Sequence, residues 1–156
     1  MDKFIPFKEI EHTADLAIQI FGRNLEELFH NAHQGFYTIV FGNFKKIQKM
    51  ANASQDKCPL KTLQLEETSL EDLLHSFLSE LNYHLQSKRT IFSPLLNLEI
   101  HQTSNGARLR INATELKLSS QFLAEADITE IKAVTYHGLK FVQENGLWSV
   151  TVIFDI

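Results

Sequence analysis

The sequence LEDLLHSFLSELNYHL, residues 70–85, decides the fold class, because its leucines and phenylalanine recur every three to four positions. That spacing places the apolar side chains on one face of an α-helix. Thr68 with Glu71 matches a capping box, and Ser69 with Asp72 matches it in a weaker form, so either Thr68 or Ser69 should cap the helix. The stripe predicts an amphipathic helix that packs one face against a core.

A second helix is predicted upstream. Asn24 can cap it, and Glu26 and Glu27 place negative charge in its first turn, where the helix dipole favours such charge. Apolar residues then recur at helical spacing as far as Val40, and Gly42-Asn43 is a suitable stop. This helix carries a glycine at position 35, which costs about 1 kcal/mol relative to alanine in a helix interior.

The rest of the sequence predicts strands separated by turns. Ser104-Asn105-Gly106 and Asn145-Gly146 are hairpin signals. Since no linker or low-complexity tract interrupts the pattern, we expect one domain over residues 1–156. Its fold should be α+β, with two helices packed on one face of a mostly antiparallel sheet. The expected strands are Phe7–Glu11, Leu16–Phe21, a short strand around 63–65, Leu96–Gln102, Ala107–Ala113, Glu130–Tyr136, Gly138–Val142 and Leu147–Ile156.

Composition narrows the class of protein. The 156 residues carry a net charge of −4, and the sequence shows no basic tract. Nucleic-acid binders usually show a basic patch, so direct, tight RNA binding is not indicated. The single cysteine, Cys58, cannot form an internal disulfide, which fits a reducing compartment. Neither a signal peptide nor a run of ~20 apolar residues is present, so we expect a soluble cytoplasmic protein with no membrane partner.

Standard catalytic motifs are missing from the sequence. It has no glycine-rich phosphate loop, nucleophile elbow, HExxH motif or paired-cysteine zinc site. Four of the seven histidines, at positions 30, 33, 75 and 84, fall on the predicted helices. We expect these four to be surface or helix-flank residues, because metal-ligand pairs need a shared, open face.

Two acidic positions stand out. In His12-Thr13-Ala14-Asp15, polar residues interrupt strand-forming sequence, and the simpler interpretation is a tight turn in which Asp15 bonds local amides. At the other end, Asp155 lies one residue from the α-carboxylate of Ile156. Two such groups repel each other, and a hard cation such as calcium or magnesium would relieve the repulsion. The alternative is a frayed terminus with both carboxylates in water.

A third segment, Glu130–His137, is unusually polar for a strand between hairpins. If it is a strand, alternate residues point to opposite faces. Lys132, Val134 and Tyr136 would then share one face, and Ile131, Ala133, Thr135 and His137 the other. The alternative is an edge strand that Lys132 protects against pairing with another chain.

Together these segments resemble the archease family. The resemblance is carried by Glu11-His12-Thr13-Ala14-Asp15-Leu16, by Glu130–His137, by the ending Val152-Ile153-Phe154-Asp155-Ile156, and by the helix stretch Leu70–Leu81. It spans essentially the whole chain, in the family's order and length. The stretch Asn31–Phe36 departs from the Ala-rich, Leu-rich pattern of the family's first helix.

The resemblance implies an accessory protein with no turnover of its own. Archeases assist the RtcB-type tRNA ligase, which joins RNA ends with GTP and divalent metal, so that the ligase is guanylylated and turns over repeatedly. The protein partner would be the ligase, which acts in tRNA splicing or RNA repair. The chain would associate with RNA only indirectly, through the ligase.

The resemblance also implies a cation site. The family binds a divalent cation, typically calcium, through the aspartate of the first motif and the last two residues of the chain. On this sequence these are Asp15, Asp155 and Ile156. The strand that starts near Leu16 could pair with the C-terminal strand and so bring Asp15 to the other two. Lys132 is a further candidate functional residue, and His12, Tyr136 and His137 belong to the same motifs.

Two other functions remain open on the sequence. A metal-dependent hydrolase or nuclease could use the acidic cluster with Lys132 and His137, although no second set of carboxylates is present for two-metal phosphoryl chemistry. A general chaperone is neither supported nor excluded.

Overall fold

The computed structural model describes residues 4–10 and 15–156. Its elements follow one another as strands, helices and hairpins in the order β1 Phe7–Ile10, β2 Leu16–Gly22, α1 Leu25–Phe41, α2 Phe44–Ala53, the 3-10 turn η1 Gln55–Lys57, β3 Leu60–Glu67, α3 Leu70–Lys88, β4 Thr90–Thr103, β5 Gly106–Lys117, α4 Ser120–Glu125, β6 Ala133–Val134, β7 Val142–Glu144 and β8 Leu147–Asp155.

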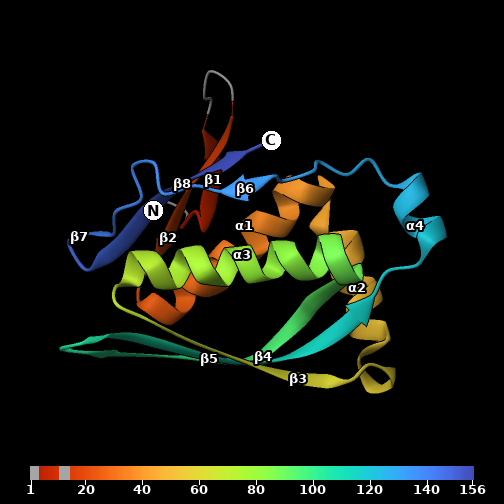
Figure 1. Cartoon of the computed structure of the whole chain (residues 1–156), viewed down its shortest axis with the longest axis horizontal. Helices are drawn as coiled ribbons and strands as arrows, with labels where there is room; N and C mark the ends of the chain where they lie inside the picture. The colour runs from red at the N-terminus through yellow and green to blue at the C-terminus, as the bar shows by residue number, and fades with distance from the viewer. Residues whose placement is uncertain (1–3, 11–14) are drawn as a thin grey trace.

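The strands form two antiparallel sheets. One has the order β1-β2-β8-β6, with β7 also paired to β8, and the other has the order β3-β5-β4. Helices α1 and α3 lie between the sheets, since α1 contacts both β2 and β4, and α3 contacts β6 as well as all three strands of the second sheet (Figure 1). The helices therefore bury apolar surface on two sides.

The predicted α+β class with antiparallel pairing is confirmed. The strands divide into two sheets where the sequence predicted one, because a strand pattern does not specify its partner. Two further helices, α2 and α4, were not predicted. In α2 only Phe44, Ile47 and Ala51 are buried, and lysines occupy much of the rest. This short stripe is a weak sequence signal.

The helix caps are formed as the sequence predicts. The Asn24 side chain accepts a hydrogen bond from the backbone N–H of Glu27 at 2.7 Å. At the start of α3, Ser69 is the cap, and its hydroxyl accepts from the N–H of Asp72 at 3.1 Å. Thr68 lies outside the helix and donates its hydroxyl hydrogen bond to the Asp72 carboxylate.

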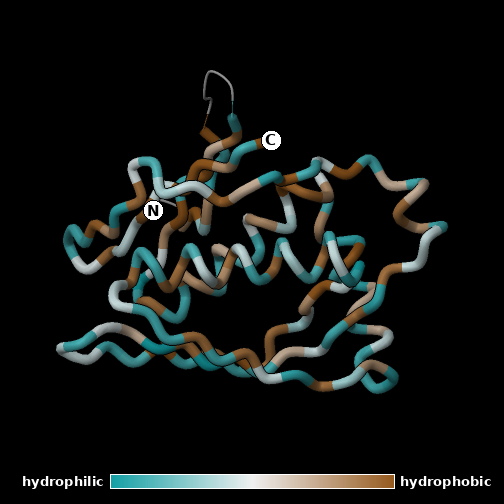
Figure 2. Tube along the Cα trace, viewed as in Figure 1, coloured by the Kyte–Doolittle hydropathy of each residue, from teal (hydrophilic) through white to brown (hydrophobic). Residues whose placement is uncertain are grey.

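The core forms where α1 and α3 meet the two sheets. The apolar stripe of α3 is buried throughout, and the trace of this helix alternates between apolar and polar residues in Figure 2. Gly35 in α1 is explained by a close approach to the first sheet. A Cβ there would lie 3.1 Å from Cδ1 of Ile18 and 3.2 Å from Cγ of Phe7, so a larger residue would require these two side chains to shift.

Within the described residues, no helix is long and apolar enough to cross a membrane.

Candidate functional site

The C-terminal end of β8 lies between two other strands of its sheet. In the antiparallel register, Leu16 of β2 is opposite Phe154, and Ala133 of β6 is opposite Asp155. Asp15 comes directly before Leu16, so it is next to the end of the β2–β8 pair at which Asp155 ends β8. The predicted pairing of the strand from Leu16 with the C-terminal strand is confirmed.

The third segment reaches the same point through its backbone. The N–H of Lys132 donates to the carbonyl of Asp155 at 2.8 Å. Thr135 donates to the carbonyl of Ile153 twice, from its N–H at 3.0 Å and its hydroxyl at 2.9 Å. The described end of the first segment, at Asp15, and the third segment thus both lie beside the last residues of β8, where Figure 1 shows β6 beside the C-terminus.

The core sets which way Asp155 points. Val152 and Phe154 are both fully buried, and Phe154 packs against Phe36 of α1 with ring centroids 5.9 Å apart. Since successive strand residues point to opposite faces, Asp155 lies on the outer face. It is exposed, as is Ile156 after it. Slipping the register by one residue would place an acid in the core.

This donor set suits a hard cation. Asp15 directly precedes β2 and Asp155 ends the neighbouring β8, and their carboxylate oxygens are of the type that calcium and magnesium prefer. In residues 4–10 and 15–156 no three His, Cys, Asp or Glu side chains gather in a way that could hold a metal ion. The predicted set contains only two such side chains, because its third member is the α-carboxylate of Ile156.

The segment 130–137 is not the strand that the sequence predicted. Only Ala133–Val134 forms a strand, and Gly138–Val142 is likewise not a strand, since β7 covers Val142–Glu144. The predicted division into two faces is also wrong. Ile131 and Val134 are both buried, whereas Lys132 and Ala133 are both exposed.

Side chains of α3 explain this change of pattern. The carbonyl of Ile131 accepts hydrogen bonds from the side-chain amides of Asn82, at 2.9 Å, and Gln86. The carbonyl of Val134 is 2.7 Å from Nε2 of His75, which donates to it. The segment is therefore hydrogen-bonded to β8 and to α3 together, which interrupts regular strand alternation. Asn82 is buried, so this hydrogen bond also satisfies a core amide.

Tyr136 projects from this anchored segment. Its ring stacks on that of His75, with centroids 3.8 Å apart and planes inclined by 11°. The residue is nevertheless 57% exposed. Local desolvation, then the carboxylates of Asp72 and Glu67, raise the pKa of the Tyr136 phenol, and a hydrogen bond to Asp72 acts in the same direction. Tyr136 therefore stays neutral while its ring is held in place.

The other candidate residues have different surroundings. His137 is exposed, and its N–H donates to the hydroxyl of Thr135 at 3.3 Å. The side chain of Lys132 is exposed, next to the hydrogen bond that its own N–H makes with Asp155. His12 lies outside the described residues.

Sequence reasoning missed the importance of two histidines. His75 was expected to be a surface or helix-flank residue, yet it joins α3 to the segment that carries Tyr136. His33 is only 2% exposed, and Nε2 lies 2.5 Å from the carbonyl of Phe92, to which it donates. Helical spacing alone gave no signal of either partner, because both lie 59 residues away along the chain.

Comparisons with known proteins agree with this architecture. Residues 7–156 match the model of the Archease protein family (MTH1598/TM1083). The chain is 29% identical to the protein archease of Thermococcus kodakarensis, covering 96% of this chain and 98% of that protein. It is 30% identical to the protein archease of Aeropyrum pernix, covering 94% of each.

A solved structure shares the fold. The solution structure of Methanobacterium thermoautotrophicum protein 1598 superposes with a TM-score of 0.70 at 21% identity, covering 97% of this chain and 99% of that one. Fold and site together define a small two-sheet α+β protein in which three distant segments meet at one sheet end. The chain belongs to the archease family.

Proposed function

We propose that this chain is an accessory protein of an RtcB-type RNA ligase in the cytoplasm. It promotes guanylylation and multiple turnover of the ligase in tRNA splicing or RNA repair, and it has no turnover of its own. One observation carries the proposal beyond family membership. The described end of the first archease-like motif and the late motif both reach the end of β8, through the pairing of Leu16 with Phe154 and of Ala133 with Asp155.

We further propose that Asp15, Asp155 and the α-carboxylate of Ile156 hold a divalent cation, calcium. Carboxylates close to each other repel, and a bound cation supplies positive charge that neutralises them. What supports the proposal is the pairing of Leu16 with Phe154, which brings the strand ends next to Asp15 and at Asp155 to the same end of the sheet.

The neighbouring surface suits a protein partner. Exposed aromatic residues are enriched at the energetic centres of interfaces, and a ring that is already held loses little entropy on binding. Tyr136 has both properties, being 57% exposed and stacked on His75. We propose that Tyr136, His137 and Lys132 form the contact surface for the ligase, beside the cation site.

A multiple-turnover ligation assay tests this function. RNA ends are supplied in excess over the ligase, and product is measured with and without this protein. We expect ligation to stop near one turnover without the protein and to continue with it. Equal product in both reactions would contradict an accessory role.

A second reaction separates the proposal from its main alternative. The protein is incubated with the same RNA and calcium or magnesium, without ligase. We expect the RNA to remain intact, whereas cleavage that depends on Asp155 would indicate a metal-dependent nuclease instead.

A further inference from the structure

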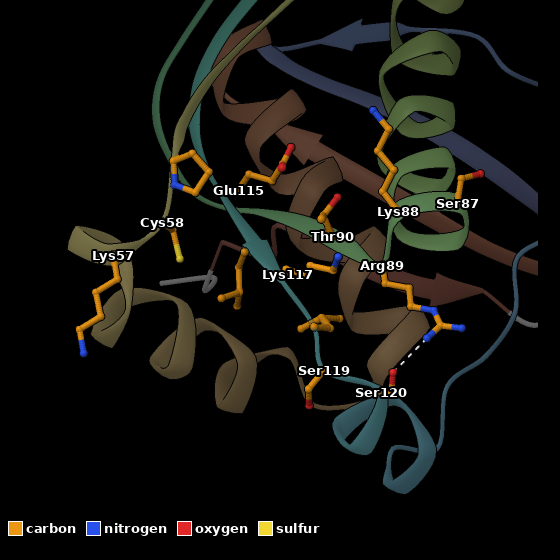
Figure 3. Close-up of a pocket in the computed structure, with 13 residues that line it drawn as sticks. Lys57, Cys58, Ser87, Lys88, Arg89, Thr90, Glu115, Lys117, Ser119 and Ser120 are labelled. Atoms are coloured by element: carbon orange, nitrogen blue, oxygen red, sulfur yellow. Dashed lines mark hydrogen bonds between the residues drawn. The ribbon is translucent and has the colours of Figure 1, made fainter.

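A hollow of about 1140 Å³ lies at the C-terminal end of α3 (Figure 3). In Figure 1 this end of α3 is beside α2, away from the C-terminus that follows β8. Three parts of the chain form it. These are the segment 57–59 that follows α2, the residues 87–90 at the junction of α3 and β4, and the residues 115–120 that lead from β5 into α4. The hydrogen bond from the N–H of Glu115 to the carbonyl of Pro59, at 3.0 Å, joins the first part to the third.

Four cationic side chains line this hollow. They are Lys57, Lys88, Arg89 and Lys117, and all four are exposed. The lining contains a single carboxylate, that of Glu115. In the part of the chain that the structure describes, none of the four cations forms an ion pair, although Nζ of Lys88 lies 6.0 Å from the centroid of the Tyr83 ring. A chain with a net charge of −4 thus has a local concentration of positive charge that it does not neutralise.

The backbone at Arg89 holds this arrangement together. Arg89 has φ 56° and ψ 38°, a left-handed conformation that costs a residue other than glycine about 1–2 kcal/mol. Its carbonyl accepts a hydrogen bond from the N–H of Leu118 at 2.8 Å, and its guanidinium donates to the hydroxyl of Ser120 at 3.2 Å. A glycine would avoid the strain but would remove one cation from the hollow.

Helix electrostatics explain only part of this cluster. Lys88 and Arg89 are at the negative end of the α3 dipole, where cations are favourable without any ligand. Lys57 and Lys117 come from η1 and β5, so the dipole of α3 gives no reason for them to gather there. The hollow also contains hydroxyl groups from Ser87, Ser119 and Ser120.

We propose that this hollow binds the phosphodiester backbone of a single-stranded nucleic acid. Lysine, arginine and serine are the side chains that commonly contact phosphates. Lys57 is at one rim and Lys88 at the opposite rim, so the charges are spread out and do not converge on one point (Figure 3). This spacing fits an extended chain of phosphates better than one small anion.

The residue types suit contacts with phosphate. Arginine forms two-pronged hydrogen bonds with carboxylate and phosphate alike, whereas lysine binds phosphate as a point charge. Three of the four cations here are lysines, and the one arginine already bonds Ser120. No aromatic residue lines the hollow itself, and the exposed ring of Tyr83 lies beside Lys88 outside it, so binding in the hollow depends on the backbone. Such binding is weak, sequence-tolerant and strongly salt-dependent.

Two matched triple variants test the proposal on the protein alone. In the first, Lys57, Lys88 and Lys117 are each changed to Gln. In the second, Lys8, Lys49 and Lys140, which are exposed and do not line the hollow, are changed in the same way. Both variants lose the same charge, and unchanged melting temperatures confirm that both are folded.

Binding is measured by fluorescence anisotropy with a labelled single-stranded RNA of about 12 nucleotides, and with DNA of the same sequence, over about 25–200 mM salt. For four phosphate contacts the logarithm of affinity should fall with the logarithm of salt with a slope of about −3, and the first triple should flatten this slope to about −1. We expect the first triple to bind about tenfold or more weakly at low salt, and the second to remain within about twofold of wild type. RNA bound more tightly than DNA would show that the sugar is also contacted.

Cys58 supplies an independent readout, because it lines the hollow and is the only cysteine. Saturating RNA should slow its alkylation by iodoacetamide in the wild type and in the second triple, but not in the first.

The proposal is overturned if RNA does not bind at low salt, if both triples weaken binding equally, or if polyglutamate displaces RNA at equal charge concentration. Because no ligase is present, these results do not depend on the function proposed above.

Discussion

The ring of His75 on α3 lies flat against the ring of Tyr136, at 3.8 Å between centroids, while Nε2 of His75 donates to the carbonyl of Val134. One side chain therefore holds both the backbone and the exposed aromatic residue of the segment beside β8. The two contacts are local to the surface that we propose for the ligase.

We expect His75→Ala to lower the free energy of unfolding by about 1–3 kcal/mol, because it removes a ring stack and a hydrogen bond. It should also raise the concentration of protein needed for half-maximal ligase stimulation. Urea unfolding and the ligation assay measure the two effects. Tyr136→Phe is the control, since it keeps the stacked ring, and its stimulation should stay closer to wild type. Normal stimulation by His75→Ala would mean that the anchoring of Tyr136 does not matter to the ligase.

Asp15→Ala and Asp155→Ala should each abolish ligase stimulation and leave the fold intact, because each removes one of the proposed cation ligands. Calcium should raise the melting temperature of the wild type, with a stabilisation of about 2.7 kcal/mol at a hundredfold excess over Kd. Neither variant should show that shift. A shift of the same size in all three proteins would indicate nonspecific binding and would refute this ligand assignment.

Extending the chain beyond Ile156 should weaken calcium binding and ligase stimulation. The added peptide bond converts the α-carboxylate into a carbonyl, which removes one negative charge from the proposed site. The same tag placed before Met1 should leave both properties close to normal. Calorimetric titration measures the calcium affinity of the two tagged proteins. Equal affinities would leave only Asp15 and Asp155 as ligands.

Lys132→Ala should reduce stimulation without reducing calcium affinity. The N–H of Lys132 bonds the carbonyl of Asp155, so its side chain starts beside the proposed cation site while supplying no ligand oxygen. Lys140→Ala, at another exposed lysine of the same region, is the matched control. If both variants stimulate as well as wild type, Lys132 serves only to protect the edge of the sheet.

Acid should destabilise the protein through His33. Burial lowers the pKa of His33 to about 4, from 6.5. In the unfolded chain this histidine takes up a proton below about pH 6.5, whereas in the folded protein it stays neutral until about pH 4. The free energy of unfolding should therefore fall as the pH is lowered through this window, by up to roughly 3 kcal/mol from this residue.

Urea unfolding at about pH 7, 5.5 and 4.5 measures this dependence. His33→Gln and His33→Phe cannot titrate there, and both should show a shallower decrease than wild type over that window. The Nδ1 atom of His33 is buried and has no hydrogen-bond partner in the described structure. Protonation of Nδ1 would therefore create a buried N–H group without an acceptor. Parallel curves for wild type and both variants would mean that His33 takes up its proton equally in both states.

The cap residues Asn24 and Ser69 and the apolar stripe of α3 could be predicted because they depend on neighbours a few positions away. The repulsion between Asp155 and the α-carboxylate of Ile156 suggested a cation site from the sequence alone, whereas the inclusion of Asp15 in that site came from the resemblance to a family. The pairing of the strand from Leu16 with the C-terminal strand was suggested by the sequence, and the structure confirms it through Leu16 and Phe154.

The sequence by itself determined the α+β class, the two long helices, the hairpin turns and the segments that meet at β8. The tertiary structure alone decided that the strands form two sheets, that segment 130–137 is held by α3, and that Lys57, Lys88, Arg89 and Lys117 surround one hollow. Helix caps and periodicity arise from contacts within one or two turns of chain. Sheet partners, buried hydrogen bonds and clusters of charge arise between residues far apart in sequence, and no local pattern records which of them will meet.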